Sequence, residues 1–393
     1  MLIDNERRRR VNEALKRCNF DALICKLPEN VVFLSGWWPL SGTSWVIYTS
    51  SGTCHLIIPA CESTEAEEDG ITDFSAYEWA HLNAPNLEMQ IVDIVRSKSK
   101  EFGINEGVIG IEESYDSIAV PLNVAEPVVF CTSTIKILKE AMPKASFVDA
   151  THVINELRVR KTSAEIEKLR IANEIADFGY DVFKEIVKPG VSEIEIAAAV
   201  NSAVMIKGCD YKGVKSARGF AQVSSADNTC RGWRPCEITS GRRLIKGDIV
   251  LLELAVVADG YWADNTRVRI AGVANSRQKE IYSLIKRAQQ AAIDSVKSGV
   301  MMCEVDKAAR DIINDAGYGM YFIHVTGHGI GWKYHEFPPL LHPQNQDKLE
   351  IGMVTSIEPG VYIPGFGGIR IEDNVVVTTE GVAVLGNYCR ELE

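Results

Sequence analysis

An acidic residue interrupts an apolar, strand-like stretch in the second half of the chain. Glu253 lies within Ile249–Val257, and the other residues of that stretch are apolar. The dipeptide Asp259-Gly260 follows, a pair that favours a two-residue hairpin turn between strands. A second strand-like stretch, which contains Asp264, begins directly after the turn. The sequence therefore predicts a β-hairpin with one acidic residue in each strand.

The turn also predicts the register of the two strands, because the residues on either side of it should pair. Glu253 is then expected opposite Thr266, with Asp264 as its diagonal neighbour on the same face of the sheet, about 7 Å away. A carboxylate buried in such a stretch is costly unless it is paired or binds a metal ion. Two interpretations follow: the acids hold a cation, or they form structural pairs with Arg267 or another arginine.

The arrangement recurs nearer the C-terminus. Glu358 and Glu372 both follow strand-like sequence, on either side of a connection rich in glycine and proline. Between the two acid pairs, His324, His328 and His335 place three of the seven histidines within 12 residues. Glycines flank His328 and permit close approach of the backbone. We therefore expect one metal centre with these ligands: Glu253, Asp264, His328, Glu358 and Glu372.

Such a ligand set suits two divalent ions, because carboxylates can bridge them; Mn, Co, Fe and Zn are all compatible, with manganese favoured. A pair of ions of this kind can generate hydroxide near neutral pH and polarise a carbonyl group. That chemistry hydrolyses an amide.

Two domains are expected from the length of 393 residues. Short apolar runs at 21–25, 45–48 and 55–58 read as strands of a smaller α/β domain over residues 1–157. The second domain, 158–393, contains an internal repeat: Val187–Val191 resembles Val296–Val300, 109 residues later, and each copy separates two helical stretches. Capping boxes at Thr162 and Ser192 predict where two of those helices begin. The second domain is therefore expected to be two similar α+β halves around a cleft.

The charge and composition of the chain exclude some classes of binding partner. A net charge of −11 disfavours nucleic acid, whose phosphates need a basic face. The sequence has no run of about 20 apolar residues, so no membrane partner is expected. The N-terminal residues lack the apolar segment of a signal peptide, and the ten cysteines form no C-x-x-C pair. These features predict a cytoplasmic protein that acts on small molecules or peptides.

At its acidic motifs the chain resembles the group of prolidase, aminopeptidase P and methionine aminopeptidase, to which creatinase also belongs. The resemblance covers nearly the whole chain and implies an α+β pita-bread catalytic domain with a pseudo-twofold repeat, preceded by a creatinase-like N-terminal domain. The motifs that carry it are Gly247–Glu253, Gly260–Arg267, Gly327–Gly331, Ile357–Gly360 and Arg370–Asp373.

The resemblance also implies roles for residues around the ligands. His324 and His335 fall where relatives place histidines that hold substrate or stabilise the tetrahedral intermediate, and Glu358 is expected to accept the proton of water. Arg370 and Arg234 are expected to contact the substrate. Members of the prolidase and aminopeptidase P branch of this group commonly form homodimers, so the resemblance implies a homodimer here.

Two departures from the family pattern stand out. Glu253 occupies a position where the metallopeptidases have aspartate, and its extra methylene leaves open whether two metal ions bind or one. The loop 227–236 has no histidine, although relatives have one there. Arg234, by binding a substrate carboxylate, or Cys236 could serve in its place.

Three functional hypotheses follow. The leading one is a metal-dependent hydrolase that cleaves a C–N peptide bond, of the Xaa-Pro dipeptidase or aminopeptidase P type, with a hydroxide that bridges the metals as nucleophile. The second is a creatinase-like or ectoine-hydrolase-like enzyme acting on a small amide or amidine. The third is an inactive binding protein on the same fold, which the cost of burying five ionisable residues disfavours.

Overall fold

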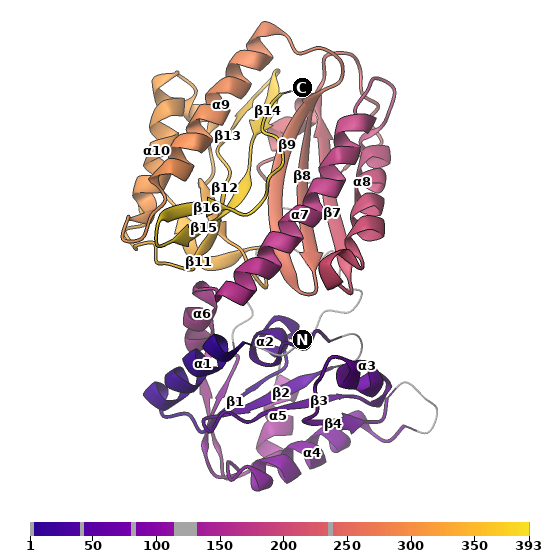
Figure 1. The fold of residues 1–393 in the computed structure, drawn as a ribbon, viewed down its shortest axis with the longest axis vertical. Helices are drawn as coiled ribbons and strands as arrows, with labels where there is room; N and C mark the ends of the chain where they lie inside the picture. Colours follow the sequence, from indigo (N-terminus) through magenta and orange to yellow (C-terminus); the bar gives the residue numbers. More distant parts are fainter. Residues whose placement is uncertain (1–3, 40–42, 80–83, 114–131, 235–238, 393) are drawn as a thin grey trace. The chain divides into compact units, whose positions relative to one another are not determined.

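The computed structural model describes residues 4–39, 43–79, 84–113, 132–234 and 239–392. The chain divides into two compact units, one with the described residues up to Arg158 and the other with those from Val159 onward. Each unit is built around its own sheets, as Figure 1 shows. In the described part of the chain, no helix combines the length and the apolar character needed to cross a bilayer.

The first unit contains a mixed six-stranded sheet in the order β4-β3-β2-β1-β5-β6. Its strands are β1 (Ala22–Cys25), β2 (Trp45–Thr49), β3 (Cys54–Pro59), β4 (Phe74–Tyr77), β5 (Val108–Ile111) and β6 (Ser146–Asp149). Its helices are α1 (Asn5–Cys18), α2 (Pro28–Ser35), η1 (Ala60–Glu62), α3 (Ser63–Glu68), α4 (Leu87–Glu101), α5 (Thr132–Ala141) and α6 (Thr151–Val159), which ends at the division. The three strands predicted at 21–25, 45–48 and 55–58 are confirmed as β1, β2 and β3.

The second unit begins with two helices that open as their sequences predict. In α7 (Ser163–Ile186), the Thr162 side chain accepts from the amide of Glu165, whose carboxylate accepts from the amide of Thr162. Ser192 and Glu195 make the same reciprocal pair at the start of α8 (Glu193–Gly208). Both predicted capping boxes are confirmed. Each satisfies amide groups that a helix leaves free in its first turn.

A three-stranded antiparallel sheet packs against α7 and α8. Its strands are β7 (Ala217–Ser225), β8 (Ile249–Ala258) and β9 (Tyr261–Ile270), and the short helices η2 (Tyr211–Gly213) and η3 (Ala226–Arg231) flank β7. The predicted hairpin is confirmed, because Glu253 pairs with Thr266 across β8 and β9. Asp259 and Gly260 form its turn with positive φ angles of 45° and 86°, the backbone geometry of a type I′ turn.

The other half of the second unit has the helices α9 (Ser276–Ser295), α10 (Met302–Asp315) and η4 (Gly319–Tyr321). Its larger sheet runs β11-β10-β12-β15-β16, and β13 and β14 form a separate hairpin. The strands are β10 (Gly327–Gly329), β11 (Glu336–Leu341), β12 (Val354–Ile357), β13 (Gly360–Ile363), β14 (Gly367–Arg370), β15 (Asp373–Thr378) and β16 (Gly381–Val384). Figure 1 shows α7 and α8 on one side of the strands and α9 and α10 on the other.

The two halves repeat one another. The amide of Gly190, after α7, donates to the Leu244 carbonyl, and the amide of Gly299, after α9, donates to the Leu349 carbonyl, each at 2.8 Å. β8 begins five residues after Leu244, and β12 begins five residues after Leu349. Counted from those starts, Glu253 and Glu358 occupy the same position in the two halves.

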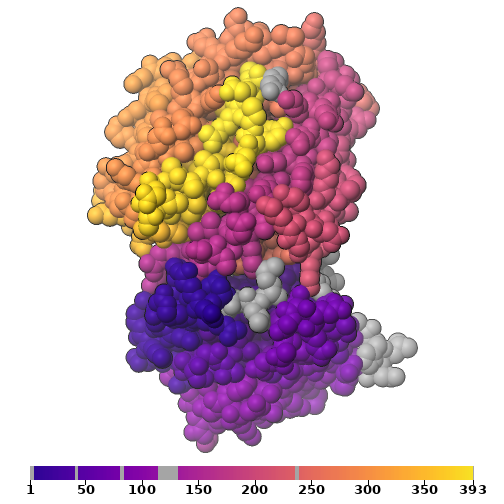
Figure 2. Space-filling view, viewed as in Figure 1, coloured from indigo at the N-terminus to yellow at the C-terminus, as the bar shows by residue number. Residues whose placement is uncertain are grey.

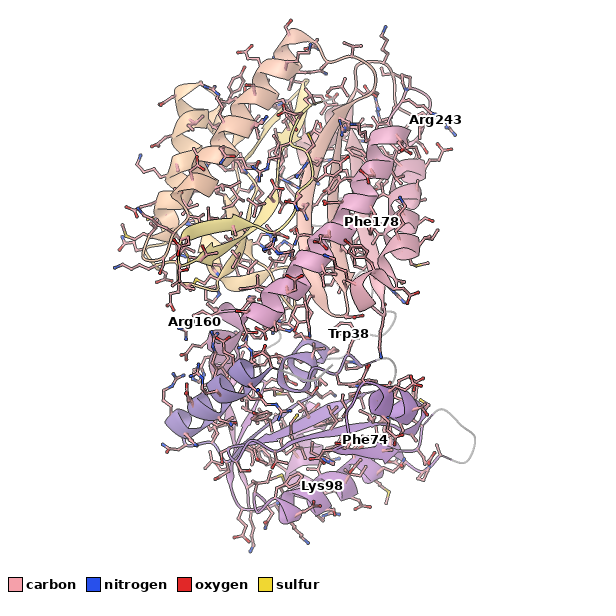
Figure 3. All side chains as sticks on the ribbon, in the orientation of Figure 1. Trp38, Phe74, Lys98, Arg160, Phe178 and Arg243 are labelled. Atoms are coloured by element: carbon pink, nitrogen blue, oxygen red, sulfur yellow. The ribbon has the colours of Figure 1, made fainter. Side chains whose placement is uncertain are left out.

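The C-terminal segment joins the halves. Figure 2 shows the last residues of the chain, in yellow, between atoms of the α9 region in orange and of the α7 region in magenta. Arg267 of β9 donates to the carbonyl of Cys389, and the hydroxyl of Tyr282 on α9 donates to the carbonyl of Arg390, both at 3.1 Å. Figure 3 labels Phe178 on α7 and Arg243 before β8, which mark the first half among the other side chains.

Candidate metal centre

The candidate ligands meet where the two halves join. Asp264 lies on β9 of the first half, and Glu372 lies between β14 and β15 of the second. Thr266 and Glu372 form a backbone bridge, in which the amide of each donates to the carbonyl of the other at 3.4 and 3.2 Å. This bridge places the carboxylates of Asp264 and Glu372 on facing elements.

His328, on β10, points its Nε2 atom at the acids. That atom lies 3.5 Å from Asp264 Oδ2 and 3.4 Å from Glu358 Oε1. The Nδ1 atom donates to the carbonyl oxygen of Gly329 at 2.9 Å, which places a proton on Nδ1 and leaves Nε2 as the ring nitrogen that faces the acids. A metal-binding histidine needs this tautomer, held by a hydrogen bond on its other nitrogen.

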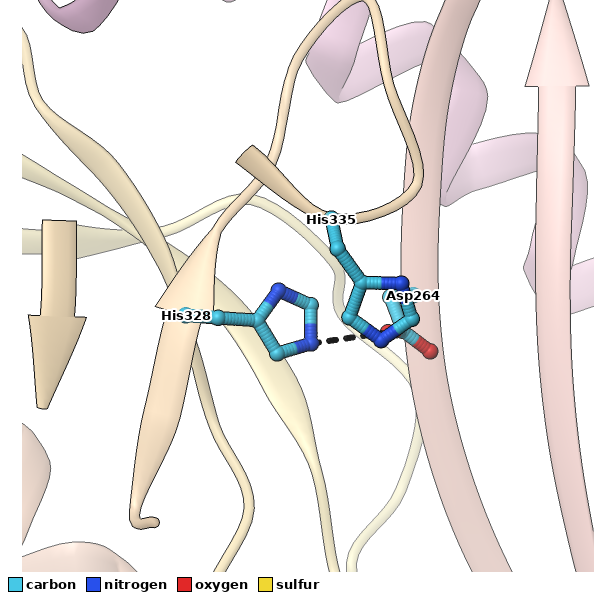
Figure 4. Close-up of side chains that lie close together, drawn as sticks. All are labelled: Asp264, His328 and His335. Carbon is cyan, nitrogen blue, oxygen red and sulfur yellow. Dashed lines mark ion pairs between the residues drawn. The ribbon is translucent and has the colours of Figure 1, made fainter. Parts of the chain in front are cut away.

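Two groups of side chains offer ligand atoms within 4.8 Å of one another. One comprises Asp264, His328 and His335, and the other comprises His328, Glu358 and Glu372. Figure 4 shows the first group, with both imidazoles turned toward the aspartate. The structure thus brings together four of the five predicted ligands, and it adds His335 to their neighbourhood.

The charges of this junction call for a cation. Burial raises the pKa of Asp264 and of Glu372 well above the usual range, and neighbouring carboxylates, among them Glu358, raise both further. Burial also raises the pKa of Glu358. Asp264 Oδ1 and Glu372 Oε1 are buried and accept no hydrogen bond from the described residues. Because an unpaired buried carboxylate oxygen is costly, the residues fit a divalent metal ion.

Glu253 is arranged differently from the other acids. Its Oε2 atom accepts from Arg370 Nη2 at 2.5 Å. Its Oε1 atom accepts from the Tyr334 hydroxyl and, at 3.3 Å, from Gln222 Nε2. Among the described residues, neither group of close ligand atoms includes Glu253.

Arg370, predicted to contact substrate, is only 3% exposed. Besides its bond to Glu253, it donates from Nε to Thr266 Oγ1 at 2.9 Å, and from Nη1 to the Tyr362 hydroxyl and the Gly232 carbonyl. The last contact ties β14 to the loop after η3.

The two other histidines of the cluster are partly buried and neutral. Burial, with Arg370 nearby, lowers the pKa of His324 to about 3. His324 Nδ1 donates to the Val325 carbonyl, and its Nε2 lies 3.0 Å from the Tyr362 hydroxyl. Burial, with His328 nearby, lowers the pKa of His335 to about 2. The Nδ1 atom of His335 is buried and has no partner among the described residues.

The loop that lacks the family histidine is partly described. Arg234 is exposed, and its guanidinium lies 5.6 Å from the centre of the Trp233 ring. Cys236 lies outside the described residues. The base of the loop is fixed by the Gly368 amide, which donates to Thr229 Oγ1 at 2.6 Å.

Three polar side chains of the site were not predicted from the sequence, namely Gln222, Tyr334 and Tyr362. Two of them carried a sequence signal, because Tyr334 directly precedes His335 and Tyr362 follows Glu358 by four residues. Gln222 carried none, since its place opposite Glu253 depends on the pairing of β7 with β8.

Acids and a histidine at the junction of two similar α+β halves define a pita-bread hydrolase of the metallopeptidase type. Comparison with known families agrees: residues 167–379 match the description "Metallopeptidase family M24", and residues 7–160 match "Creatinase/Prolidase N-terminal domain". The chain belongs to metallopeptidase family M24, whose members use divalent metal ions.

Relatives extend over the whole chain. The Xaa-Pro dipeptidase of Pyrococcus horikoshii is 32% identical over 396 residues, covering 100% of both chains. The crystal structure of the prolidase from Pyrococcus horikoshii superposes with a TM-score of 0.79 at 29% identity, over 99% of this chain and 100% of that one. The Xaa-Pro dipeptidase structure from Bacillus anthracis gives a TM-score of 0.78 at 28% identity, over 98% of each.

Proposed function

We propose that the protein is a metal-dependent dipeptidase that cleaves the peptide bond before a proline residue. The observation that carries this proposal is the convergence of ligand atoms from Asp264, His328, Glu358 and Glu372 at one junction. The substrate class is supported by relatives named Xaa-Pro dipeptidase that match the full length of the chain.

The four residues Asp264, His328, Glu358 and Glu372 would hold the metal. A divalent ion there would lower the pKa of water and polarise the carbonyl of the bond to be cleaved. Glu358 is the best placed of the three carboxylates to accept a proton from water, because its side chain is 12% exposed, against 3% for Asp264 and 1% for Glu372. Ser356 Oγ donates to Glu358 Oε1 at 3.1 Å and fixes its orientation.

The neutral histidines would act on the developing oxyanion. His335 lies beside His328 and has a buried Nδ1 atom free of protein partners among the described residues. A neutral imidazole can donate one hydrogen bond to an oxyanion without a change of protonation. His324 would help through Tyr362, whose hydroxyl it contacts.

The test compares Xaa-Pro dipeptides with the matching Xaa-Ala dipeptides, after chelation and again after addition of Mn²⁺, Co²⁺, Fe²⁺ or Zn²⁺. We expect hydrolysis of Xaa-Pro that is lost on chelation and restored by metal, with Asp264→Asn as the inactive control. Full activity in metal-free protein would refute metal dependence. Metal-dependent hydrolysis of small amides, with no dipeptide cleaved, would refute the substrate class.

Several finer expectations belong to the same proposal. They are manganese as the physiological ion, substrate contact by Arg234 and Arg370, domain limits at 1–157 and 158–393, a homodimer, and a cytoplasmic location.

A further inference from the structure

The carboxylates of the junction fall into two kinds. Asp264 and Glu372 each keep one buried oxygen without a partner among the described residues. Glu253 is also buried, at 7% exposed, yet both of its oxygens accept hydrogen bonds. A cation would therefore satisfy the free oxygens of Asp264 and Glu372, whereas the oxygens of Glu253 are already satisfied.

The partners of Glu253 come from three separate elements. Gln222 lies on β7, Tyr334 lies in the segment between β10 and β11, and Arg370 ends β14. The ring of Tyr334 is itself held, with its centroid 5.8 Å from that of Trp262 in a stacked arrangement. Rotation of Glu253 toward Asp264 would break all three bonds at once and remove the shortest carboxylate contact of Arg370, whose Nε atom lies farther from Glu372 and Glu358, at 3.8 and 3.9 Å. The loss of one member of a buried ion pair is strongly destabilising.

Arg370 also contacts the loop after η3, and this contact depends on its pairing with Glu253. Its Nη1 atom holds the Gly232 carbonyl of the loop after η3, while Nη2 holds Glu253. The Glu253 carboxylate therefore orients the guanidinium that fixes this loop beside the site. A metal ion on Glu253 would compete with the guanidinium for the same oxygens.

We infer that Glu253 is not a metal ligand but the counter-ion that, with Tyr334, positions Arg370, so that the centre holds one divalent ion per chain. The ion is bound by Asp264, His328, Glu358 and Glu372, the same four residues on which the proposed function rests. Glu253 thus acts through Arg370 on the loop, and its contribution is separate from binding of the ion.

The pseudo-twofold repeat supplies a matched test. Glu253→Gln and Glu358→Gln are the same substitution at equivalent positions of the two halves. Metal-free wild type and both variants are titrated with Mn²⁺ by calorimetry, and bound metal is measured by elemental analysis after gel filtration. We expect one ion per chain in wild type and in Glu253→Gln, and at least about a tenfold loss of affinity in Glu358→Gln, as expected for removal of a ligand. The EPR spectrum of the Mn²⁺ form should be that of an isolated ion.

Two ions per chain in wild type, or a spectrum of two coupled ions, would overturn the inference while leaving the proposed function intact. Loss of the ion in Glu253→Gln would also overturn it. No bound ion in wild type would instead refute the proposed function. Tyr334→Phe removes only a hydroxyl and should also keep one ion, so it serves if Glu253→Gln does not fold.

Discussion

The imidazole of His335 lies against that of His328, with ring centroids 4.2 Å apart. Both rings point toward Asp264, but their hydrogen-bond partners differ. His328 Nδ1 donates to a backbone carbonyl, whereas His335 Nδ1 has no partner among the described residues. The geometry predicts that one ring binds the metal and the other serves the reaction.

His335→Gln should therefore lower kcat by roughly 10²- to 10³-fold, the loss typical of one missing oxyanion donor, while the metal content stays unchanged. His328→Gln should lose the metal. Steady-state kinetics and elemental analysis of the two variants separate these outcomes. A parallel fall in metal content in His335→Gln would show that His335 is a ligand.

Glu372→Gln should stabilise the metal-free protein. Burial and neighbouring carboxylates disfavour the charged form of Glu372 and raise its pKa. Glutamine is uncharged and avoids this cost, and a gain of ~1 kcal/mol would raise the midpoint of thermal unfolding by about 2–4 °C. Added metal should raise the midpoint of wild type and no longer that of the variant. Thermal melts with chelator and with metal measure both effects, with the exposed Glu380→Gln as control. A lower midpoint of the variant in chelator would contradict this.

Gly327→Ala should disrupt the metal centre through the backbone. A Cβ atom at Gly327 would lie 1.9 Å from the Ser356 carbonyl oxygen, so β10 would have to move away from β12 and carry His328 with it. We expect weaker metal binding and a loss of about 1–3 kcal/mol in unfolding free energy, the usual cost of overpacking. Gly241→Ala is the control, because no atom lies within 4 Å of its Cβ position. Equal metal affinity in both variants would argue against the placement of His328.

The stability of the first unit should fall as pH rises toward neutrality, because of Glu112. Burial raises the pKa of Glu112 to about 7 from 4.5, so the folded unit keeps a proton that the unfolded chain releases. The contribution of Glu112 to the free energy of unfolding is complete below pH 4.5 and is lost as the pH rises to about 7. It amounts to at most ~3 kcal/mol. Its carboxylate accepts from the amides of Lys26 and Leu27 at the start of α2.

Hydrogen exchange of the α2 amides, corrected for intrinsic rates, measures this pH dependence. Glu112→Gln cannot ionise and should show a flatter profile between pH 4.5 and 7. Identical profiles for wild type and variant would exclude Glu112 as the cause.

Local patterns predicted much of the fold. The Asp259-Gly260 turn determined the register that places Glu253 opposite Thr266, because a two-residue loop leaves one pairing for the flanking strands. The repeat around Gly190 and Gly299 predicted the two halves. These features depend on residues close together in the sequence.

Contacts between distant residues could not be predicted in this way. Arg267 was a candidate partner of the acids, but side chains alternate along a strand, and Thr266 already faces Glu253. Arg267 instead pairs with Asp373, at 2.7 Å, and the partner of Glu253 is Arg370, which is 117 residues away. Only the joining of the two halves brings Arg370 there.

The equivalence of Glu253 and Glu358 has a consequence for how such a site can change. Each half supplies a glutamate four residues after the first residue of its strand, β8 or β12, so the junction contains the same group in duplicate. One glutamate can then pair with an arginine, as Glu253 does with Arg370, while the other, Glu358, stays among the metal ligands. The repeat thus gives the centre a redundancy that lets metal stoichiometry diverge without loss of the scaffold.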